Sequence, residues 1–357
     1  MQGVHVPLRS VSTEEKESTG DSLSVYAYKK EKGRWCRLSP QERQQTTRIG
    51  DLTTPQEFIH ILTWNVNFSY ENRADRLQCA LNHIRDDVFA CTSNEHAPPP
   101  CCVLLQEVEA EVLPVLLQHE WVRTHFRVTP VSNFSWPRRA HYGNVTLVSR
   151  SIAVLAASSL VFENSDMSRN ALIVDLQLFA KEVGDEEKED KAVAIDKDGE
   201  GTQEKAFKPV KFRIANVHLE SLAQGAKARP EQLAIVAEVL KDQALHGGLV
   251  GGDMNAIFLT DASTPKQVGL LDAYTGDEWD TNGYTWGFQP RLDSFVPGRL
   301  DKILYTPGSG VVEVEHPRCV GVGLKTADGV WVSDHHGLLA KMRLMTRATV
   351  RDPVAEP

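Results

Sequence analysis

The sequence predicts an α/β fold in which one large domain holds most of the 357 residues. From about residue 58, short apolar runs bounded by turn residues alternate with segments of helical periodicity, which is typical of α/β proteins. The chain is 41% hydrophobic and 24% charged, as in ordinary globular proteins with a substantial core. Two successive apolar runs, 144–149 and 151–159, are close enough to pair antiparallel, so we do not expect a purely parallel sheet.

The apolar runs have the length and the residue content of β-strands. In the main domain they lie at 59–66, 101–105, 144–149, 172–179, 212–217, 248–251, 299–305 and 337–342. Before this domain, residues 23–28 predict a shorter strand, and we expect Trp35 in the segment 34–38 to pack against the main body.

Helices are predicted for the segments 73–84, 108–117 and 232–241, which lie between these strands. In the first, Leu77, Leu81 and Ile84 share one face, and in the third, Leu233, Val236 and Leu240 form a stripe. This spacing of three and four residues is that of a helix with one buried face.

We predict three parts of the chain: an extension at 1–54 that is largely disordered at its start, the α/β domain at 55–345, and a tail at 346–357. Residues 181–208 interrupt the domain, and the part from 181 to 205 carries ten acidic residues against five lysines. We interpret this stretch as a solvated acidic insertion in a hairpin.

Composition excludes several classes of protein. The longest uncharged apolar runs, such as 153–162, are shorter than the ~20 residues of a membrane span, so no membrane association is expected. The N-terminus has no apolar signal core, and the six cysteines form no Cys-x-x-Cys pair. We therefore expect a protein of the nucleus or the cytoplasm that is not secreted. The net charge of −9 argues against a surface that coats long nucleic acids.

Polar side chains gather where the predicted strands end, the place where α/β proteins keep their sites. Asn65 and Asn67 end the run 59–66, and because side chains alternate along a strand they point to one face. Glu107 directly follows a buried strand, where a carboxylate is costly unless it is paired or binds a metal. Each residue alone fits an ordinary strand-end turn or the first turn of a helix equally well.

The later strands show the same pattern. His218 and Ser221 follow the run 212–217, and Asp253 and Asn255 follow a pair of glycines. Asp301 lies on a predicted strand, and the segment 332–337 places Asp334 and His335 before the last one. An aspartate on a buried strand can orient an imidazole, although a surface salt bridge and a loop histidine are alternatives.

Together these residues favour attack of water on a phosphoester, assisted by a metal ion. Such a reaction needs a carboxylate for Mg²⁺, a base, and neutral or cationic donors around the phosphoryl oxygens. The sequence contains no phosphate-binding GxxxxGK[ST] loop, no HExxH motif, no zinc-type Cys/His spacing and no GxGxxG after a strand.

The order of these motifs resembles the endonuclease/exonuclease/phosphatase superfamily over about residues 60–342. The motifs that carry the resemblance are TWNVN, LLQEV, NVHLES, GGDMN, RLDKI and SDHHG. Within the superfamily, HLES followed by RPEQL, the Tyr142 segment and the YTW that precedes RLDKI are most similar to type 2 tyrosyl-DNA phosphodiesterases.

The resemblance implies a two-sheet sandwich flanked by helices, with the site at the strand ends. It implies Glu107 as the ligand of Mg²⁺, with Mn²⁺ as an alternative, assisted by residue 67. The implied catalytic residues are Asn65, Asp253, Asn255, Asp301, Asp334 and His335, in which Asp253 activates water and Asp301 orients His335. The implied substrate-binding residues are Tyr142, His218, Ser221, Arg229 and Trp286.

Two positions depart from the family pattern. Asn67 stands where the family has a metal-assisting Asp, and Gly287-Phe288 stands where the phosphodiesterases read Asp-Thr. The first departure predicts weaker Mg²⁺ binding, and the second leaves the substrate assignment more open than the superfamily assignment.

The sequence therefore predicts a monomeric, Mg²⁺-dependent phosphodiesterase that acts on DNA ends carrying a 5′-tyrosyl adduct, or on a related RNA end. The alternatives are an abasic-site endonuclease or another nuclease of the superfamily, a small-molecule phosphatase, and a catalytically silent scaffold. Asn67 is the one feature that favours the silent scaffold.

Overall fold

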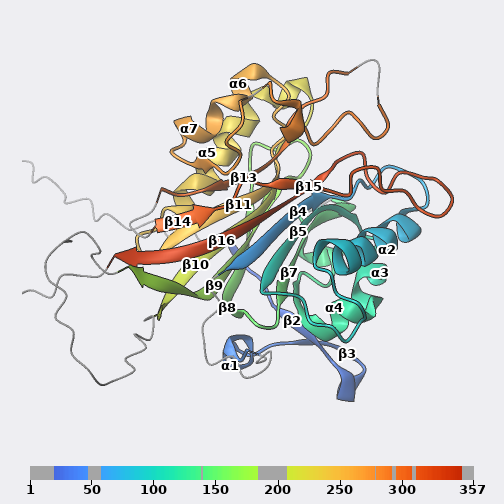
Figure 1. The fold of residues 1–357 in the computed structure, drawn as a ribbon, viewed down its shortest axis with the longest axis vertical. Coiled ribbons are helices and arrows are strands. Elements are labelled where there is room, and N and C mark those ends of the chain that lie inside the picture. Colours follow the sequence, from blue (N-terminus) through green and yellow to red (C-terminus); the bar gives the residue numbers. More distant parts are fainter. Residues whose placement is uncertain are drawn as a thin grey trace, which may run out of the picture.

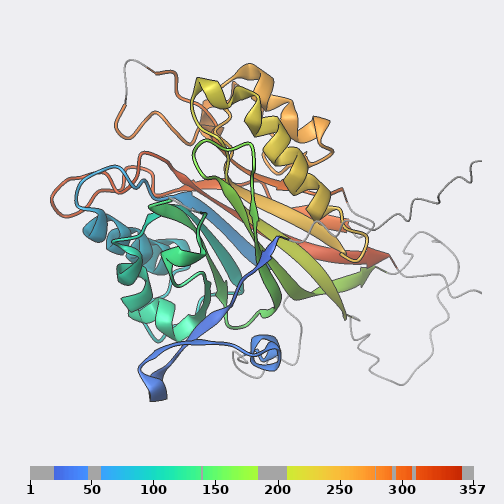
Figure 2. The ribbon, with the colours of Figure 1, turned by 180° about the vertical axis from the view of Figure 1, so that it is seen from behind.

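The computed structural model describes residues 20–46, 58–137, 140–183, 207–277, 279–291, 295–307 and 311–347. Within these ranges two β-sheets face each other and helices cover their outer faces (Figures 1 and 2). The predicted two-sheet sandwich flanked by helices is confirmed. No helix of these ranges is long and apolar enough to cross a membrane.

The first sheet contains β11, the strand that carries Asp253. Its order is β12 (Leu271–Asp272), β13 (Asp301–Tyr305), β11 (Gly247–Asp253), β10 (Phe207–His218), β9 (Asn170–Val183), β8 (Ala153–Val161) and β1 (Asp21–Ser22). The strands β10 and β11 run parallel, whereas β13 pairs antiparallel with β11.

The second sheet contains β4 and β5, which run parallel. Its order is β16 (Gly337–Arg347), β4 (Ile59–Asn65), β5 (Cys101–Glu109), β7 (Tyr142–Ser149), β6 (Phe126–Thr129), β2 (Tyr26–Lys29) and β3 (Arg34–Arg37), with β14 (Val311–Val314) and β15 (Arg318–Val320) paired to β16. The two sheets join where the end of β16 runs parallel to the end of β9.

Three apolar clusters hold the layers together. Ile61, Phe212 and Ile303 belong to the cluster between the sheets. Two outer clusters pack the helices, with Leu81 in one and Val236 in the other. Burial of each such side chain contributes about 1.5–3 kcal/mol. The helices are α1 (Pro40–Gln44), α2 (Arg73–His83), α3 (Leu113–Gln118), α4 (Glu120–His125), α5 (Ala228–Leu240), α6 (Leu259–Ala262) and α7 (Thr264–Gln267).

The helix predicted at 108–117 is wrong in its first part. Glu107 has a φ of +58°, and the pairing of β5 with β7 shifts register between Leu105 and Val108. The strand resumes after this bulge, since Val108 pairs with Gly143, and helix α3 begins only at Leu113. The bulge re-aims the Glu107 side chain, a common use of bulges beside active sites. Helix α2 is confirmed, and α5 begins one turn earlier than predicted.

The strand predicted at 23–28 in the N-terminal segment is present as β2, and β3 follows it. Strand β1 pairs with β8 of the first sheet and β2 pairs with β6 of the second, so this segment ties the two sheets together. Trp35 packs against the main body as predicted, and its Nε1 donates to the Leu117 carbonyl at 3.0 Å. Residues 1–19 and 47–57 lie outside the described residues.

Two further predicted segments are shorter than expected. The acidic insertion predicted at 181–208 begins later, because β9 continues to Val183 and β10 begins at Phe207. The tail predicted at 346–357 begins later as well, because β16 reaches Arg347. Residues 184–206 and 348–357 lie outside the described residues.

Candidate active site

The predicted site residues converge at one end of the sandwich. Asn65 ends β4, His218 ends β10 and Asp253 ends β11. Because parallel neighbours end at the same edge, these side chains are brought together. Asp301 opens the antiparallel strand β13 and lies directly opposite Asp253 in the register. His335 precedes β16, whose start pairs with the end of β4.

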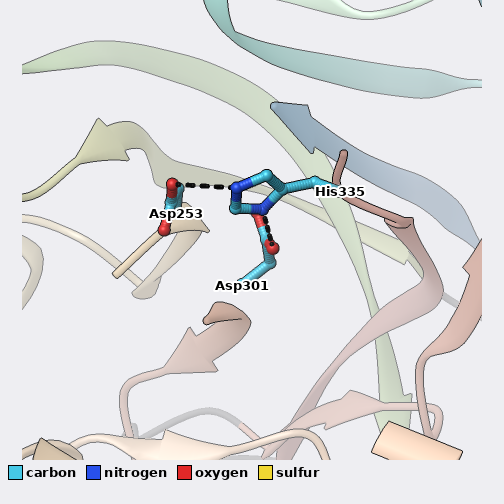
Figure 3. A group of neighbouring side chains, drawn as sticks. All are labelled: Asp253, Asp301 and His335. Carbon is cyan, nitrogen blue, oxygen red and sulfur yellow. Dashed lines mark hydrogen bonds and ion pairs between the residues drawn. The ribbon is translucent and has the colours of Figure 1, made fainter. Parts of the chain in front are cut away.

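Asp301, His335 and Asp253 form a buried row (Figure 3). The Asp301 Oδ2 lies 2.7 Å from the His335 Nδ1, and the His335 Nε2 lies 3.7 Å from the Asp253 Oδ2. Burial alone would lower the pKa of His335, but the carboxylates of Asp301, Asp253 and Asp334 raise it well above its usual value. His335 is therefore an imidazolium that presents an N–H toward Asp253.

Asp253 is held by two further donors. The Asn255 amide donates to Oδ1 at 2.8 Å, and the Asn65 Nδ2 donates to Oδ2 at 3.0 Å. Burial raises the pKa of Asp253 to about 7. A carboxyl group with a pKa near the working pH is suited to general acid–base catalysis.

His218 reaches the same carboxylate but in the opposite charge state. Its Nε2 lies 3.4 Å from the Asp253 Oδ2, and its Nδ1 lies 2.7 Å from the Nη1 of Arg169. An arginine stays protonated and can only donate, so the His218 Nδ1 accepts and the ring proton sits on Nε2. Burial, followed by the charges of Arg169 and His335, holds the pKa of His218 well below its usual value.

Arg169 is a residue that sequence reasoning missed. It is buried, and its guanidinium also lies 5.5 Å from the ring of Tyr142. The only signal in the sequence was an arginine directly before an apolar run, which is not distinctive.

Glu107 fits the predicted role of metal ligand. Its Oε1 accepts from the Asn65 Nδ2 at 3.2 Å and its Oε2 from the Phe68 amide at 2.9 Å. Burial raises the pKa of Glu107. Among the described residues its carboxylate forms no ion pair with a lysine or arginine, and the nearby His218 is neutral. A partly buried carboxylate without a fixed counter-charge suits a hard cation such as Mg²⁺.

Asn67, which the resemblance implies as an assisting metal ligand, has both polar side-chain atoms engaged by other residues. Its Oδ1 accepts hydrogen bonds from the Ser69 amide, the Ser69 hydroxyl and the Tyr70 amide, so this oxygen is already used to shape the loop. Its Nδ2 donates to the Asp334 Oδ1 at 2.7 Å, and the Trp286 Nε1 donates to the other Asp334 oxygen at 3.1 Å. Asn67 therefore orients Asp334 in this arrangement.

Ser221 and Arg229 lie beside the site in different ways. The Ser221 hydroxyl donates to the Asn255 Oδ1 at 3.0 Å, which links Ser221 to the site through one contact. Arg229 departs from the predicted groove: it is 2% exposed and its guanidinium holds Asp261 at 3.2 and 2.9 Å. It also donates to the carbonyls of Glu220 and Leu222. Arg229 thus fastens the loop that carries Ser221.

Aromatic side chains border the site. Tyr142 stacks on Phe68, a residue missed from the sequence because it follows Asn67 as an ordinary apolar residue. Trp286 lines a groove of about 290 Å³ together with Ile257, Phe258 and Val296. The Trp286 Nε1 donates to Asp334 and the Tyr142 ring lies 6.4 Å from the ring of His218, so both predicted aromatic residues adjoin the site.

Asp253, Asp301 and His335 also place potential metal-ligating atoms within 4.8 Å of one another. The Nδ1 of His335 is already engaged by Asp301 at 2.7 Å, and a hard cation such as Mg²⁺ prefers oxygen ligands to an imidazole. Glu107 is thus the better candidate for a hard cation in this arrangement.

The chain matches the model of the Endonuclease/Exonuclease/phosphatase family over residues 62–335. No curated protein matches the chain. Among solved structures, a humanized TDP2 from D. rerio is similar, with a TM-score of 0.58 and 18% identity over 81% of this chain and 100% of that chain. TDP2 from C. elegans is similar as well, with a TM-score of 0.57 and 19% identity over 80% of this chain and 75% of that chain.

A D. rerio TDP2 structure in complex with a single-strand DNA product is equally similar, with a TM-score of 0.58 and 18% identity over 81% of this chain and 100% of that chain. At these identities the likeness shows a shared fold. The superfamily resemblance drawn from the sequence, with TDP2 among the similar structures, is confirmed.

Proposed function

Because the chain belongs to the endonuclease/exonuclease/phosphatase family of phosphoesterase hydrolases, we propose that it is a metal-dependent phosphodiesterase for 5′-phosphotyrosyl DNA ends. The observation that carries this proposal is the environment of Asp253. A single buried carboxyl group with a pKa near 7 lies between a cationic histidine, a neutral histidine and two asparagines.

Asp253 is the proposed base. Its carboxylate takes a proton from a water molecule while the water oxygen bonds to phosphorus and the bond from phosphorus to the phenolic oxygen breaks. The Asn255 backbone amide, which donates to the Asp253 Oδ1, holds the carboxylate in place for this transfer. The tyrosine leaves as a phenolate, whose conjugate acid has a pKa of about 10, so protonation of the leaving group matters less than stabilisation of the phosphoryl charge.

His335 and Asn65 are the proposed donors to the phosphoryl oxygens. The His335 Nε2 lies 3.7 Å from the Asp253 Oδ2, and the Asn65 Nδ2 donates to the Asp253 Oδ2 and to the Glu107 Oε1, so both donors lie beside the carboxylates where the phosphate would bind. Asp301 keeps the His335 ring oriented and charged through its 2.7 Å contact. Fixed donors in a buried site stabilise developing charge without reorganisation.

Glu107 is the residue proposed to hold the divalent cation, Mg²⁺ or Mn²⁺. When bound, the cation would neutralise charge on the phosphate and on the departing oxygen. Asp334 would support the site through its contacts with Asn67 and Trp286.

The proposed substrate is a DNA end, or a related RNA end. The TDP2 structure with a single-strand DNA product supports this proposal by analogy of fold. The net charge of −9 favours an enzyme that contacts only an end, since a long duplex would require a broad basic surface. We propose that the protein acts as a monomer, in the nucleus or the cytoplasm.

One assay tests the function. The purified protein is incubated with Mg²⁺ and a 5′-tyrosyl oligonucleotide, an abasic duplex or an inositol phosphate. We expect cleavage of the first substrate, and loss of turnover in Asp253→Asn and His335→Ala with the fold retained by circular dichroism. Cleavage of the abasic duplex alone would identify an abasic endonuclease, and no cleavage of any substrate would favour a silent scaffold.

A further inference from the structure

Gln289 is a buried glutamine that directly follows Gly287-Phe288, where the chain departs from the family pattern. It is 2% exposed. Its Nε2 lies within hydrogen-bond distance of three backbone carbonyls, those of Gly321 at 3.3 Å, Ser333 at 3.0 Å and His335 at 3.2 Å. Two of these carbonyls flank Asp334, so one side chain holds the main chain on both sides of this aspartate.

The orientation of the Gln289 amide is fixed by its partners. The Gly323 amide donates to the Gln289 Oε1 at 3.0 Å, and the His336 Nε2 lies 3.1 Å from the same oxygen. A backbone amide can only donate and a backbone carbonyl can only accept, so the oxygen faces Gly323 and the nitrogen faces the three carbonyls. Both hydrogens of the Gln289 Nε2 therefore serve the main chain around His335.

The segment 333–335 is held from its other side by β4. The Trp64 Nε1 donates to the same His335 carbonyl at 3.0 Å, and the Ser333 hydroxyl donates to the Asn65 carbonyl at 2.6 Å. The backbone of His335 is thus seated between β4 and Gln289. The position of its ring follows from contacts with the main chain as well as from the contact with Asp301.

The chain just before Gln289 also contacts Asp301. The Thr285 hydroxyl accepts from the Asp301 amide at 3.0 Å, and the Thr285 carbonyl accepts from the His336 amide at 2.7 Å. One short segment, 285–289, therefore holds the main chain on both sides of the 2.7 Å contact between Asp301 and His335.

We propose that Gln289 is a positioning residue of the reaction, which places the imidazolium of His335 through its backbone. This inference rests on the proposed phosphodiesterase function. A donor to a phosphoryl oxygen is effective when it is fixed before the reaction starts. Without the Gln289 amide, buried carbonyls of the segment 333–335 lose their donor, and the segment must move to find another. The ring of His335 moves with it.

Gln289→Met tests the proposal, because methionine has a similar length and shape but no hydrogen to donate. On a 5′-tyrosyl oligonucleotide with Mg²⁺, we expect kcat to fall about 30-fold with KM little changed. This loss is below the ~10²-fold cost of a misplacement of ~1 Å, and it falls on kcat because the contact of His335 strengthens in the transition state. A rise in KM with kcat unchanged, or no change in either, would overturn the proposal.

Gln289→Glu is a second variant, which also carries the test if Gln289→Met does not fold. It keeps the shape of the side chain and the acceptor oxygen for Gly323, but it has at most one hydrogen where the Gln289 Nε2 has two. We expect kcat to fall at least about tenfold. Wild-type kcat in Gln289→Glu would overturn the proposal, since shape alone would then suffice.

Thr306→Val is the matched control. Thr306 is 4% exposed, and its hydroxyl accepts from the Gly248 amide at 3.0 Å, at the end of β11 that lies away from Asp253. This variant also removes a buried hydrogen bond between a side chain and the main chain. We expect both Thr306→Val and Gln289→Met to unfold at lower urea concentration, but Thr306→Val to keep the wild-type kcat. An equal loss of kcat in both would overturn the proposal.

A spectroscopic measurement separates failure of the proposal from failure of the proposed function. Nitrogen NMR of protein labelled in its histidine rings compares wild type with Gln289→Met and Thr306→Val. We expect the ring signals of His335 to shift only in Gln289→Met, and those of His218 to stay in place in both variants. That result without turnover of any phosphoester by the wild type would refute the phosphodiesterase and keep the role of Gln289. Unshifted His335 signals in Gln289→Met would overturn that role.

Discussion

Two buried histidines face the same oxygen of Asp253, yet their surroundings give them opposite charges. His335 approaches the Asp253 Oδ2 at 3.7 Å and His218 at 3.4 Å. At its other nitrogen His335 meets the Asp301 carboxylate, whereas His218 meets the Arg169 guanidinium. The pKa of His335 is accordingly raised by neighbouring carboxylates against the effect of burial, and the pKa of His218 is lowered by burial and by Arg169.

The comparison shows that equal burial does not decide the charge of an imidazole. The charge is decided by the residue at the ring nitrogen that faces away from Asp253, because that residue either stabilises or repels the added proton. One carboxylate can therefore receive a cationic donor from the β16 side and a neutral donor of fixed tautomer from the β10 side. Only the cationic donor can neutralise charge on a phosphoryl oxygen.

The largest effect should come from removal of the charge behind His335. In Asp301→Asn, His335 loses the carboxylate that holds its proton, so we expect kcat on a 5′-tyrosyl oligonucleotide to fall about 10³-fold at neutral pH, somewhat less than the ~10⁴-fold loss for a triad aspartate. Asp242→Asn, an exposed position beyond α5, serves as the control and should be silent. A loss of kcat of less than threefold in Asp301→Asn would contradict the inference that Asp301 sets the charge of His335.

The pH dependence of the wild type follows from the raised pKa of His335. Because its folded pKa lies above the unfolded value of about 6.5, the stability contributed by its proton is fully present below pH 6.5 and is lost as the pH rises through the folded pKa. We expect the stability difference between wild type and His335→Gln to be largest at pH 6 and to shrink at alkaline pH, measured by urea unfolding. A difference that grows with pH would contradict a cationic His335.

A smaller loss of activity is expected when Arg169, the partner of His218, is replaced. Arg169→Met removes the donor at the His218 Nδ1 and the positive charge that disfavours protonation, so the pKa of His218 should rise and its tautomer should no longer be fixed. We expect kcat/KM to fall about tenfold. For Arg169→Lys, which keeps the positive charge, we expect kcat/KM to lie between the values of wild type and Arg169→Met. Equal kcat/KM values for the Met and Lys variants would show that the charge has no effect and that only packing matters.

The smallest effect concerns residue 67. Asn67→Asp places a carboxylate where an amide now donates to Asp334 at 2.7 Å, so two like charges would meet unless a cation lies between them. We expect the Mg²⁺ concentration for half-maximal rate to fall a few-fold, and stability without Mg²⁺ to fall by about 1 kcal/mol. An unchanged Mg²⁺ requirement would place residue 67 away from the metal.

Much of this site could be predicted from the sequence, because polar residues at the ends of apolar strands meet at one sheet edge. Asn65, Asp253, Asp301 and His335 converge as expected. Arg169 could not be found in this way, since it precedes β9 as an ordinary arginine and its contact with His218 becomes visible only when the paired ends of β9 and β10 are placed side by side.

Other errors came from local patterns that tertiary contacts override. The residues after Glu107 have helical spacing, but pairing with β7 keeps Val108 in the strand. Arg229 follows a motif that resembles a substrate loop, yet its contact with Asp261 becomes visible only once α5 and α6 are placed together. In the N-terminal segment the strand predicted at 23–28 is present as β2, whereas β1 and β3 have too few apolar residues to signal strands, since each depends on a partner strand.

The protonation states of His335 and His218 can be measured directly, and they decide whether the two histidines carry different charges. Nitrogen NMR of the protein labelled in its histidine rings, at pH 7, reports which ring nitrogens carry hydrogen, and His335→Gln and His218→Gln assign the signals. We predict that both nitrogens of His335 are protonated and that His218 is neutral with its proton on Nε2. Two histidines in the same charge state would contradict the account.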